Sequence, residues 1–381
     1  MESALSESDH SHLRRALSLA IKGRGRVEPN PMVGCVIVKD GRVIGEGYHQ
    51  QFGGPHAEPN ALSACVESPR GATAHVTLEP CCHTNKKTPP CVPRLLEAQI
   101  GRVVIGALDP NPLVAGKGAA QLKAAGVQVE VLDLPTARQL IAPFIARTTF
   151  GRPYVTLKWA ESADGKVAGP RGRRVQITNE QSTRLVHELR SRSDAILVGI
   201  NTVLMDDPLL NARRVEPLRP MTRIVLDRKL QIRPASRLVQ TALETRTLVY
   251  TSSRMTETDR ARELIRAGVE LRVAAESPAG LSLADVITDI GTLGATHLIV
   301  EPGPTLARSF LVRNSMLWDR AWVFRSLMRI DDPSATPAPP TPIGKVAELA
   351  IGTDQLTEYL NPASDAMFSP EPSADFLLAT C

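Results

Sequence analysis

The stretch Gly53-Gly54-Pro55-His56-Ala57-Glu58 is followed along the chain by Glu79-Pro80-Cys81 and by Thr88-Pro89-Pro90-Cys91. One imidazole and two thiolates are a donor set that binds Zn²⁺ and leaves a fourth position open for water. Glu58 stands two residues after His56, a spacing at which a carboxylate can move protons beside the metal without binding it. The sequence therefore predicts the zinc ligands His56, Cys81 and Cys91, with Glu58 as the catalytic proton carrier.

The order His-x-Glu, Pro-Cys and a later Cys is the pattern of zinc hydrolytic deaminases. In that chemistry the metal lowers the pKa of water toward neutrality, and the glutamate passes the proton to the leaving amine. The second thiolate does not follow at C-x-x-C distance here, because an insert from Cys82 to Pro90 separates Cys81 from Cys91. Cys82 and His83 therefore stay open as alternatives to Cys81.

Motifs occur in order at residues 53–58, 77–81, 87–91, 109–112 and 115–118. Together they resemble the bifunctional deaminase-reductases of riboflavin biosynthesis, the RibD (RibG) type. This resemblance implies a cytidine-deaminase-like three-layer domain, which removes the 2-amino group of a phosphoribosylated diaminopyrimidinone. It also implies substrate contacts at Asn30, His49, His83, Lys87 and Asn111, with Lys87 at the phosphate.

Hydrophobic periodicity predicts alternating helices and strands in this first domain. The expected helices start near residue 13, capped by Asp9 or Ser11, and cover 56–66, 91–98, 118–125 and 137–150. The expected strands cover 33–38, 43–47, 74–78, 103–107 and 127–131. This order predicts an α/β sheet flanked by helices, with sites beyond the carboxyl ends of the strands.

Gly151-Arg152-Pro153 marks a boundary, so we expect a deaminase domain over residues 1–150 and a second α/β domain over 151–330. The predicted strands lie near 154–160, 195–199, 223–227, 246–251, 269–273, 297–301 and 320–325. The predicted helices lie near 179–192, 257–267, 282–291 and 304–313, the first with a capping box at Thr178 and Gln181. Residues 331–381 are predicted to be a Pro-rich loop and a C-terminal segment without clear periodicity.

The second domain continues the family's motif order at residues 157–158, 164–166, 189–190, 195–199, 202–204, 206–208 and 301–306. The resemblance implies a dihydrofolate-reductase-like α/β domain that uses NADPH to reduce the ribose of the deaminated intermediate. It places the cofactor at Ala160, Gln176, Thr202, Asp206, Gly303, Pro304, Thr305, Leu306, Ala307, Arg308 and Ser309. It places the substrate at Arg174, Arg190, Leu210, Arg213 and Glu301.

The residue types at some of these positions suit the cofactor and substrate groups that the resemblance assigns to them. The segment Gly303–Ser309 begins a predicted helix directly after a predicted strand, and such a helix N-terminus suits a pyrophosphate. The guanidinium groups of Arg190 and Arg213 can each donate two hydrogen bonds to the oxygens of a phosphate. The second domain also departs from the family's pattern. Arg174 replaces a frequent Ser, Gln176 replaces a usual Trp, and Pro302 removes a backbone donor near the cofactor. A deaminase with a degenerate second domain therefore stays an alternative.

The amino-acid composition limits the kinds of binding partner that we expect. The 381 residues carry a net charge of +5, and only 4% of them are aromatic, which leaves few platforms for stacking nucleic-acid bases. We therefore expect a phosphorylated small molecule as the partner, and we rank a polynucleotide-editing deaminase below this. Without a long apolar run or a secretory signal, and with three cysteines clustered within residues 81–91, we expect a cytoplasmic protein that binds no membrane. We also expect a homo-oligomer.

Overall fold

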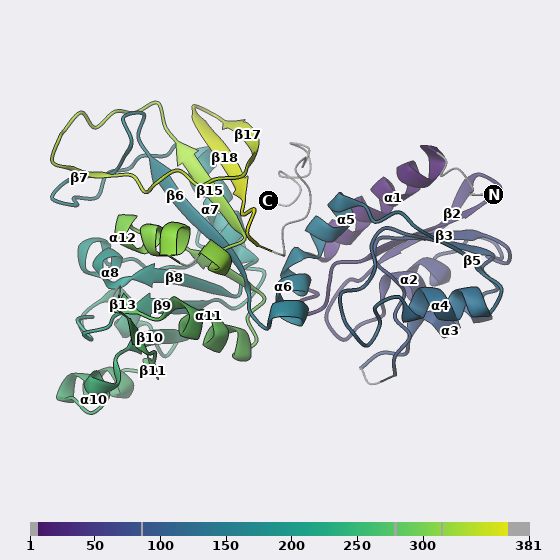
Figure 1. Cartoon of the computed structure of the whole chain (residues 1–381), viewed down its shortest axis with the longest axis horizontal. Coiled ribbons are helices and arrows are strands. Elements are labelled where there is room, and N and C mark those ends of the chain that lie inside the picture. Colours follow the sequence, from purple (N-terminus) through teal and green to yellow (C-terminus); the bar gives the residue numbers. More distant parts are fainter. Residues whose placement is uncertain (1–6, 85–86, 278–279, 314, 365–381) are drawn as a thin grey trace. The chain divides into compact units, whose positions relative to one another are not determined.

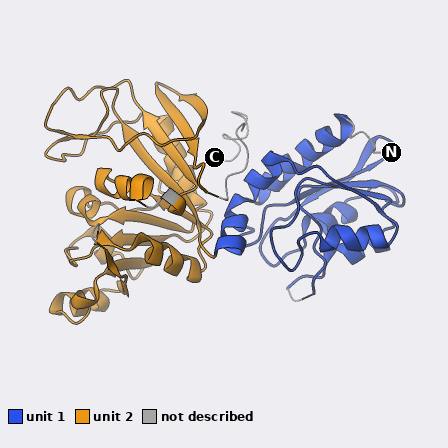
Figure 2. Ribbon diagram, in the orientation of Figure 1, with its two compact units in different colours: residues 1–150, 380 blue, residues 151–379, 381 orange. Residues whose placement is uncertain are grey.

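The computed structural model describes residues 7–84, 87–277, 280–313 and 315–364. The chain forms two compact units, one up to Phe150 and one from Gly151 onward, which Figure 2 shows in blue and orange. Each unit has its own main sheet and its own hydrophobic core. Among the helices within those ranges, none combines the length and the apolar character of a membrane span.

Unit 1 contains a five-stranded sheet in the order β2-β1-β3-β4-β5 (Figure 1). Its strands are β1 (Gly34–Lys39), β2 (Arg42–Tyr48), β3 (Thr73–Val76), β4 (Arg102–Ile105) and β5 (Gln128–Val131). β1 pairs antiparallel with β2 and β3, whereas β3, β4 and β5 are parallel. Asp40 and Gly41 both have positive φ, as the tight turn between β1 and β2 requires.

Helices cover both faces of this sheet. They are α1 (Glu7–Ala20), α2 (Ala57–Ser63), α3 (Cys91–Glu97), α4 (Lys117–Ala124), α5 (Pro135–Leu140) and α6 (Ala142–Phe150). Apolar residues of α2, α3 and α4 share one core with the sheet, whereas Ala16 of α1 packs with Val36 and Val38 of β1. The result is the predicted three-layer arrangement.

Gly47 brings α2 into close contact with β2. A Cβ at Gly47 would lie 2.3 Å from the amide nitrogen of Ala61 and 2.6 Å from the carbonyl oxygen of Ala57. Only glycine permits this approach. The contact sets the position of α2 and therefore of His56, which caps its N-terminus.

The predicted capping role of Asp9 or Ser11 is wrong, because both residues lie inside α1. Asp9 lies inside α1 and is buried, where its carboxylate accepts two hydrogen bonds from Arg102, at 2.8 and 3.0 Å. His75 Nε2 lies 2.9 Å from the same carboxylate. The α1 helix begins at Glu7, and Asp9 instead ties this helix to β3 and β4.

Unit 2 contains a nine-stranded sheet in the order β11-β10-β9-β8-β14-β6-β15-β18-β17. Seven of its strands match predicted ones: β6 (Tyr154–Glu161), β8 (Ala195–Gly199), β9 (Thr222–Leu226), β10 (Thr247–Thr251), β11 (Glu270–Val273), β14 (His297–Val300) and β15 (Arg320–Arg325). Wherever two of these seven strands are neighbours, they run parallel, so the carboxyl ends of all seven lie along the same edge of the sheet.

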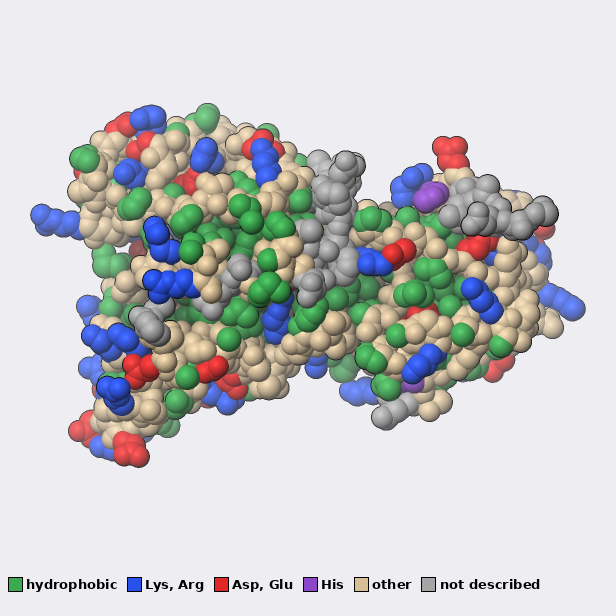
Figure 3. Space-filling view, viewed as in Figure 1, with side chains coloured by type: hydrophobic (Ala, Val, Ile, Leu, Met, Phe, Trp, Pro, Cys, Tyr) green, Lys and Arg blue, Asp and Glu red, His purple; other side chains and the backbone are tan. Residues whose placement is uncertain are grey.

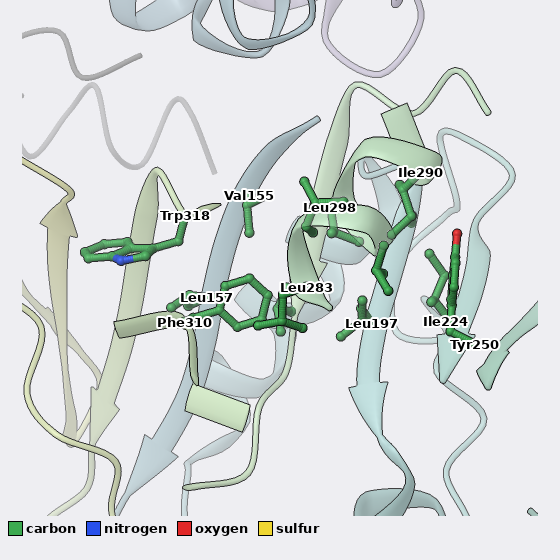
Figure 4. Close-up of a cluster of buried hydrophobic side chains, with 14 of the residues drawn as sticks. Val155, Leu157, Leu197, Ile224, Tyr250, Leu283, Ile290, Leu298, Phe310 and Trp318 are labelled. Atoms are coloured by element: carbon green, nitrogen blue, oxygen red, sulfur yellow. The ribbon is translucent and has the colours of Figure 1, made fainter. Parts of the chain in front are cut away.

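The two faces of this sheet carry separate cores. One packs against α11 (Leu283–Thr292), α12 (Pro304–Arg308) and the π-helix Ser309–Arg313. Figure 4 shows Leu283, Ile290 and Phe310 from this layer among the strand side chains. The other packs against α7 (Glu180–Ser191), α8 (Ile200–Asp206), α9 (Arg237–Gln240) and α10 (Asp259–Arg266).

Several details of unit 2 differ from the sequence-based expectation. Asn179 rather than Thr178 caps α7, because its side chain accepts a hydrogen bond from the Ser182 amide at 2.8 Å. The helices α8 and α9 were not predicted. The expected loop and tail after residue 330 instead contain β16 (Ala335–Pro337), β17 (Lys345–Ile351) and β18 (Asp354–Leu360).

These late strands belong to unit 2. β18 pairs antiparallel with β15 along its length, and β17 pairs with β18. The Pro-rich β16 pairs with β7 (Lys166–Pro170) to form a two-stranded ribbon. The sheet therefore extends well beyond residue 330. Residues 365–381 lie outside the described part of the chain.

Candidate active sites

His56, Cys81 and Cys91 come together in unit 1. Their ligand atoms all lie within 4.8 Å of one another, and Nδ1 of His56 is 3.5 Å from Cys81 Sγ and 3.4 Å from Cys91 Sγ. Within the described residues this is the one group of three or more His, Cys, Asp or Glu side chains so arranged. It is also the group that the sequence predicts.

Backbone hydrogen bonds place the two cysteines together. Cys91 is the first residue of α3, and its amide donates to the carbonyl oxygen of Cys81 at 3.0 Å. The amide of Val92 donates to the same oxygen at 3.2 Å. The insert between Cys81 and Cys91 therefore closes on itself and returns the chain to the metal group.

Cys82 points elsewhere. It is partly buried and packs against the hydrophobic core that α2, α3 and α4 share with the sheet. It is not part of the three-residue group, and neither is His83. The geometry thus favours Cys81 among the three candidates for this ligand.

The donor set fits zinc. Two buried sulfur atoms and one imidazole nitrogen converge, and soft thiol ligands with imidazole are the set that zinc selects. A hydrogen bond with Cys81 and burial raise the pKa of the Cys91 thiol well above its ordinary value. Such thiols ionise when a cation compensates their charge, which is the electrostatic setting of a metal site.

Thr88 holds the far side of the His56 ring. Its Oγ1 lies 3.0 Å from Nε2 of His56. A proton on Nε2 would leave the lone pair of Nδ1 facing the two sulfur atoms, which is the tautomer that a metal ligand needs. The sequence of the Thr88–Cys91 segment did not indicate this role for Thr88.

Glu58 is buried beside this group. It is 3% exposed, and Cys91 Sγ donates a hydrogen bond to its Oε2 at 3.2 Å. Burial and the nearby Cys81 raise the pKa of Glu58. A carboxyl group here can accept and release a proton close to the metal position, as the sequence predicts.

A cavity of about 300 Å³, which we call the first cavity, opens onto the metal group. All five side chains predicted to contact the substrate line it: Asn30, His49, His83, Lys87 and Asn111. Two aromatic residues not predicted, Phe52 and Phe144, also line it, and the Lys87 ammonium lies 4.4 Å from the centre of the Phe52 ring. The first cavity thus combines apolar walls with polar groups from several segments.

Two of these polar residues are held in place by each other. Nδ1 of His49 lies 2.9 Å from the carbonyl oxygen of Pro55, and its Nε2 lies 3.2 Å from Nδ2 of Asn30. The rings of His49 and His56 meet edge to face, with centres 5.1 Å apart. The Asn30 amide is therefore positioned through the same segment that carries His56.

Glu79 organises another part of the wall of the first cavity, a role that was not predicted. Its carboxylate accepts hydrogen bonds from the amides of Asp109, Gly116 and Ala119, at 3.2, 2.8 and 2.9 Å. These bonds fix the loop that carries Asn111. A buried acidic residue directly before Pro80 and Cys81 is the sequence signal that could have suggested this role.

Unit 2 contains a larger cavity of about 1070 Å³, the second cavity, along the carboxyl ends of its parallel strands. Most of the predicted cofactor positions line it: Ala160, Gln176, Thr202, Asp206, Gly303, Pro304, Thr305, Leu306 and Ser309. Ala307 is instead fully buried in the core, and Arg308 is exposed and does not line the cavity. These two residues follow Leu306 in α12 and the helix directs their side chains away from the second cavity.

The predicted substrate residues divide into two sets. Arg174 and Glu301 line the second cavity, whereas Arg190, Leu210 and Arg213 are not among its lining residues. Arg190 reaches it through Glu301, to which it donates two hydrogen bonds at 2.8 and 2.7 Å. Leu210 is 2% exposed with φ of +49°, so it shapes the adjoining loop rather than the cavity wall.

Lys158 lies beside this ion pair and was quoted in the sequence motifs without a role. It lines the second cavity, and burial lowers the pKa of its ammonium, with Glu301 opposing and Arg190 reinforcing this effect. Burial alone would raise the pKa of Glu301, but Arg190 and Lys158 lower it. The cavity wall, which we call the floor together with the residue behind it, therefore carries an ammonium and a carboxylate, and the Arg190 guanidinium lies behind the carboxylate.

Several basic side chains lie close to Arg190 and Glu301. Burial, Arg190 and Arg213 together lower the pKa of His187 to about 4, and the Arg213 amide donates to its Nδ1 at 3.3 Å. Arg174 and Arg190 in turn lower the pKa of Arg213, after the effect of burial. A cluster of this kind suits a phosphate group.

The two units and their cavities define a two-domain enzyme that combines a zinc-binding deaminase with a reductase. Residues 6–107 match the profile of the cytidine and deoxycytidylate deaminase zinc-binding region, and residues 153–323 match the RibD C-terminal domain. The chain belongs to the RibD family of bifunctional riboflavin biosynthesis proteins. Its unit 1 has the cytidine-deaminase-like fold and its unit 2 the dihydrofolate-reductase-like fold.

Individual relatives show the extent of the similarity. The riboflavin biosynthesis protein RibD of Aquifex aeolicus is 41% identical over 319 residues, which cover 84% of this chain and 86% of that protein. RibD of Actinobacillus pleuropneumoniae is 43% identical, with 80% of each chain covered.

Comparison with solved structures also shows similarity to RibD proteins. Acinetobacter baumannii RibD, form 1, superposes with a TM-score of 0.80 at 32% identity, covering 93% of this chain and 99% of that one. The Thermotoga maritima diaminohydroxyphosphoribosylaminopyrimidine deaminase/5-amino-6-(5-phosphoribosylamino)uracil reductase gives 0.79 at 34% identity, with the same coverage.

Proposed function

We propose that unit 1 deaminates 2,5-diamino-6-(5-phosphoribosylamino)pyrimidin-4-one and that unit 2 then reduces the ribose of the product to a ribityl chain with NADPH. The observation that carries the proposal is the convergence of His56, Cys81 and Cys91 with the buried Glu58 in one cavity. The named reaction pair of the Thermotoga maritima relative supports the choice of substrate.

In unit 1, His56, Cys81 and Cys91 would hold Zn²⁺, which supplies a Lewis acid that activates water. Glu58 takes a proton from the attacking water and delivers it to the departing amine, so that ammonia leaves. Asn30, His49 and Asn111 orient the pyrimidine from the cavity wall, and Lys87 meets the phosphate. The apolar Phe52 and Phe144 shield this chemistry from bulk water.

In unit 2, NADPH bound in the second cavity would supply the hydride for C1′ of the sugar. Lys158 is a credible acid for the sugar oxygen that leaves C1′, because its pKa is lowered toward the working pH. The charge of Glu301 favours the ammonium form of Lys158, and Arg190 holds the Glu301 carboxylate in place. Arg174, Arg190 and Arg213 provide the charge for the substrate phosphate.

The proposal has three further parts. A homo-oligomer, a cytoplasmic location and NADPH as the cofactor remain predictions. Nucleic acid as a substrate finds no support on the visible face in Figure 3, where basic side chains of the described residues are scattered among acidic ones. A degenerate second domain is disfavoured by the intact group of Lys158, Glu301 and Arg190.

The test is to incubate the purified zinc-loaded protein with the diaminopyrimidinone ribotide, with and without NADPH. Ammonia release and the absorbance of NADPH are followed together. We expect ammonia in both cases and NADPH consumption after it. Ammonia without NADPH consumption would show that unit 2 is degenerate, whereas zinc-loaded protein that releases no ammonia would remove the substrate assignment.

A further inference from the structure

The chain that follows β15 is fastened to the turn between β6 and β7. We call residues 326–338 the strap. The Ala163 amide of the turn donates a hydrogen bond to the carbonyl oxygen of Met328, at 2.8 Å. Farther along the strap, the Ala338 amide donates to the carbonyl oxygen of Gly165, at 2.9 Å. Backbone hydrogen bonds therefore tie both ends of the strap to the same turn.

Between these two ties, Asp164 binds the middle of the strap. Its carboxylate oxygens accept hydrogen bonds from two consecutive amides, those of Ile330 and Asp331, each at 3.0 Å. The Ser162 hydroxyl donates to Oδ1 of the same carboxylate at 2.7 Å and so orients it. The hydrogen bond from Ile330, and after it the one from Ser162, lower the pKa of Asp164, so the carboxylate is charged at neutral pH. A single charged group thus holds the strap at its centre.

The strap forms part of the wall of the second cavity. Thr336 and Pro337 line this cavity, together with Val167 and Ala168 of β7. Thr336 and Ala168 are paired residues of the ribbon, so the strap and β7 enter the wall as one piece. β7 follows β6, the strand that contributes Lys158 to the floor. The position of the strap therefore shapes the wall on the β6 side of the cavity.

The ribbon is a weak anchor for the strap. β16 has three residues, and its register against β7 shifts twice within them. Pro337 has no amide hydrogen to donate to the pairing. Two strands alone are marginally stable in water, and elements of this kind open locally at a low cost in free energy. The charge-assisted hydrogen bonds to Asp164 therefore contribute a large share of the local stability of the strap.

We propose that Asp164 is a positioning residue of the reductase, which holds the strap closed on the β6 side of the second cavity and so retains the ligand bound there. Asp164 does not itself line the cavity, so it acts through the backbone of the strap. Asp164 lies within the match to the RibD C-terminal domain, which covers residues 153–323, whereas the strap lies beyond it. The inference rests on the proposed reductase function, because it concerns the same cavity.

Hydrogen exchange on the full, zinc-loaded chain measures this latch directly. We expect Asp164→Ala to speed the exchange of the Ile330 and Asp331 amides by at least about 10-fold, because two charge-assisted hydrogen bonds are lost. Asp164→Asn keeps one acceptor oxygen and should give a smaller increase. Arg329→Ala is the matched control, since it removes an exposed charge that pairs with Asp331 within the strap, and it should leave the exchange unchanged. Unchanged exchange in β8 and β14 shows that unit 2 is still folded.

Binding of NADPH, followed by the fluorescence of its nicotinamide ring, measures the consequence for the ligand. We expect the dissociation constant to rise about 10-fold in Asp164→Ala, to rise less in Asp164→Asn and to stay the same in Arg329→Ala. The kcat of NADPH oxidation at saturating NADPH should change by less than about 2-fold, since the strap contributes to binding and not to hydride transfer. A residue that only stabilises the fold would not separate binding from turnover in this way.

The outcomes are distinct. Faster exchange with an unchanged dissociation constant overturns the inference, because the strap would then open without releasing the ligand. Equal exchange in the wild type and in Asp164→Ala overturns it too, because the strap would not depend on Asp164. If the wild type binds no NADPH while the exchange still responds to Asp164, the reductase part of the proposed function fails, and the role of Asp164 in retaining the ligand fails with it.

Discussion

The first and second cavities are built in different ways. The first is small, and its key groups come from a few short segments around residues 56–58, 79–91 and 109–111. The second is more than three times larger, and its walls come from the ends of many strands, from β6 to the Pro-rich β16. Metal chemistry needs a few donors at fixed separations, whereas a dinucleotide needs an extended surface.

From this difference we expect the two units to tolerate substitution differently. Replacing one donor of the first cavity removes a bond that no neighbour can supply. Replacing one wall residue of the second cavity, such as the unusual Gln176 or Pro302, leaves the floor of Lys158, Glu301 and Arg190 unchanged.

The largest effect should come from Cys81→Ser. We expect this variant to lose bound zinc and ammonia release, because a hydroxyl group replaces one of two thiolates. Cys82→Ser is its matched control and should keep both, since Cys82 packs in the core. Zinc content by atomic absorption and ammonia release measure the result. Zinc loss in the Cys82 variant alone would exchange the two assignments.

Glu58→Gln should keep zinc but slow ammonia release by about 10³-fold, because the amide cannot carry the proton. Unit 2 should still oxidise NADPH when the deaminated intermediate is supplied directly. Steady-state rates for the two half-reactions check both statements. A parallel loss of NADPH oxidation would mean that the two sites are not independent.

Lys158→Met should slow NADPH oxidation by about 10²-fold and leave ammonia release unchanged. The wild type should lose reductase activity as the pH rises, because the Lys158 ammonium deprotonates, and this should begin below the ordinary lysine range since burial lowers its pKa. A pH profile of NADPH oxidation tests this sign. An alkaline decline that persists unchanged in Lys158→Met would rule Lys158 out as its source.

The smallest effect should come from Thr88→Val, which removes the partner of His56 Nε2 but keeps the shape of the side chain. Zinc affinity should fall by about 10-fold, whereas activity at saturating zinc should change little. Competition with a chromogenic chelator measures the affinity. A large loss of activity at saturating zinc would show that Thr88 acts on the substrate instead.

The sequence predicted unit 1 almost to the level of single residues. His56, Glu58, Cys81 and Cys91 stand at fixed spacings on short segments, so their meeting follows from local structure. The role of Glu79 was not predicted, because its hydrogen-bond partners are backbone amides within residues 109–119, and a backbone amide leaves no signal in the sequence. Asp9 was misread because an acidic residue near a helix start resembles a cap until its long-range partner Arg102 is known.

In unit 2 the sequence predicted the parallel strands and most of the cofactor positions in the second cavity, but not the ribbon that contributes to its wall. Buried strands such as β8 and β14 are short apolar runs that periodicity detects. The ribbon of β7 and β16 depends on pairing between residues more than 160 positions apart, as Thr336 with Ala168. Proline in β16 also suggested a loop, because such edge strands carry no pattern of their own.

The pairing of β18 with β15 also bears on how the chain is made. The RibD C-terminal profile ends at residue 323, inside β15, whereas the partner strand β18 covers residues 354–360. A growing chain on the ribosome therefore holds β15 with one open edge until β18 has emerged. Open edges pair with other chains. A protein shortened at the end of the profile would carry the same open edge permanently, and we would expect it to aggregate.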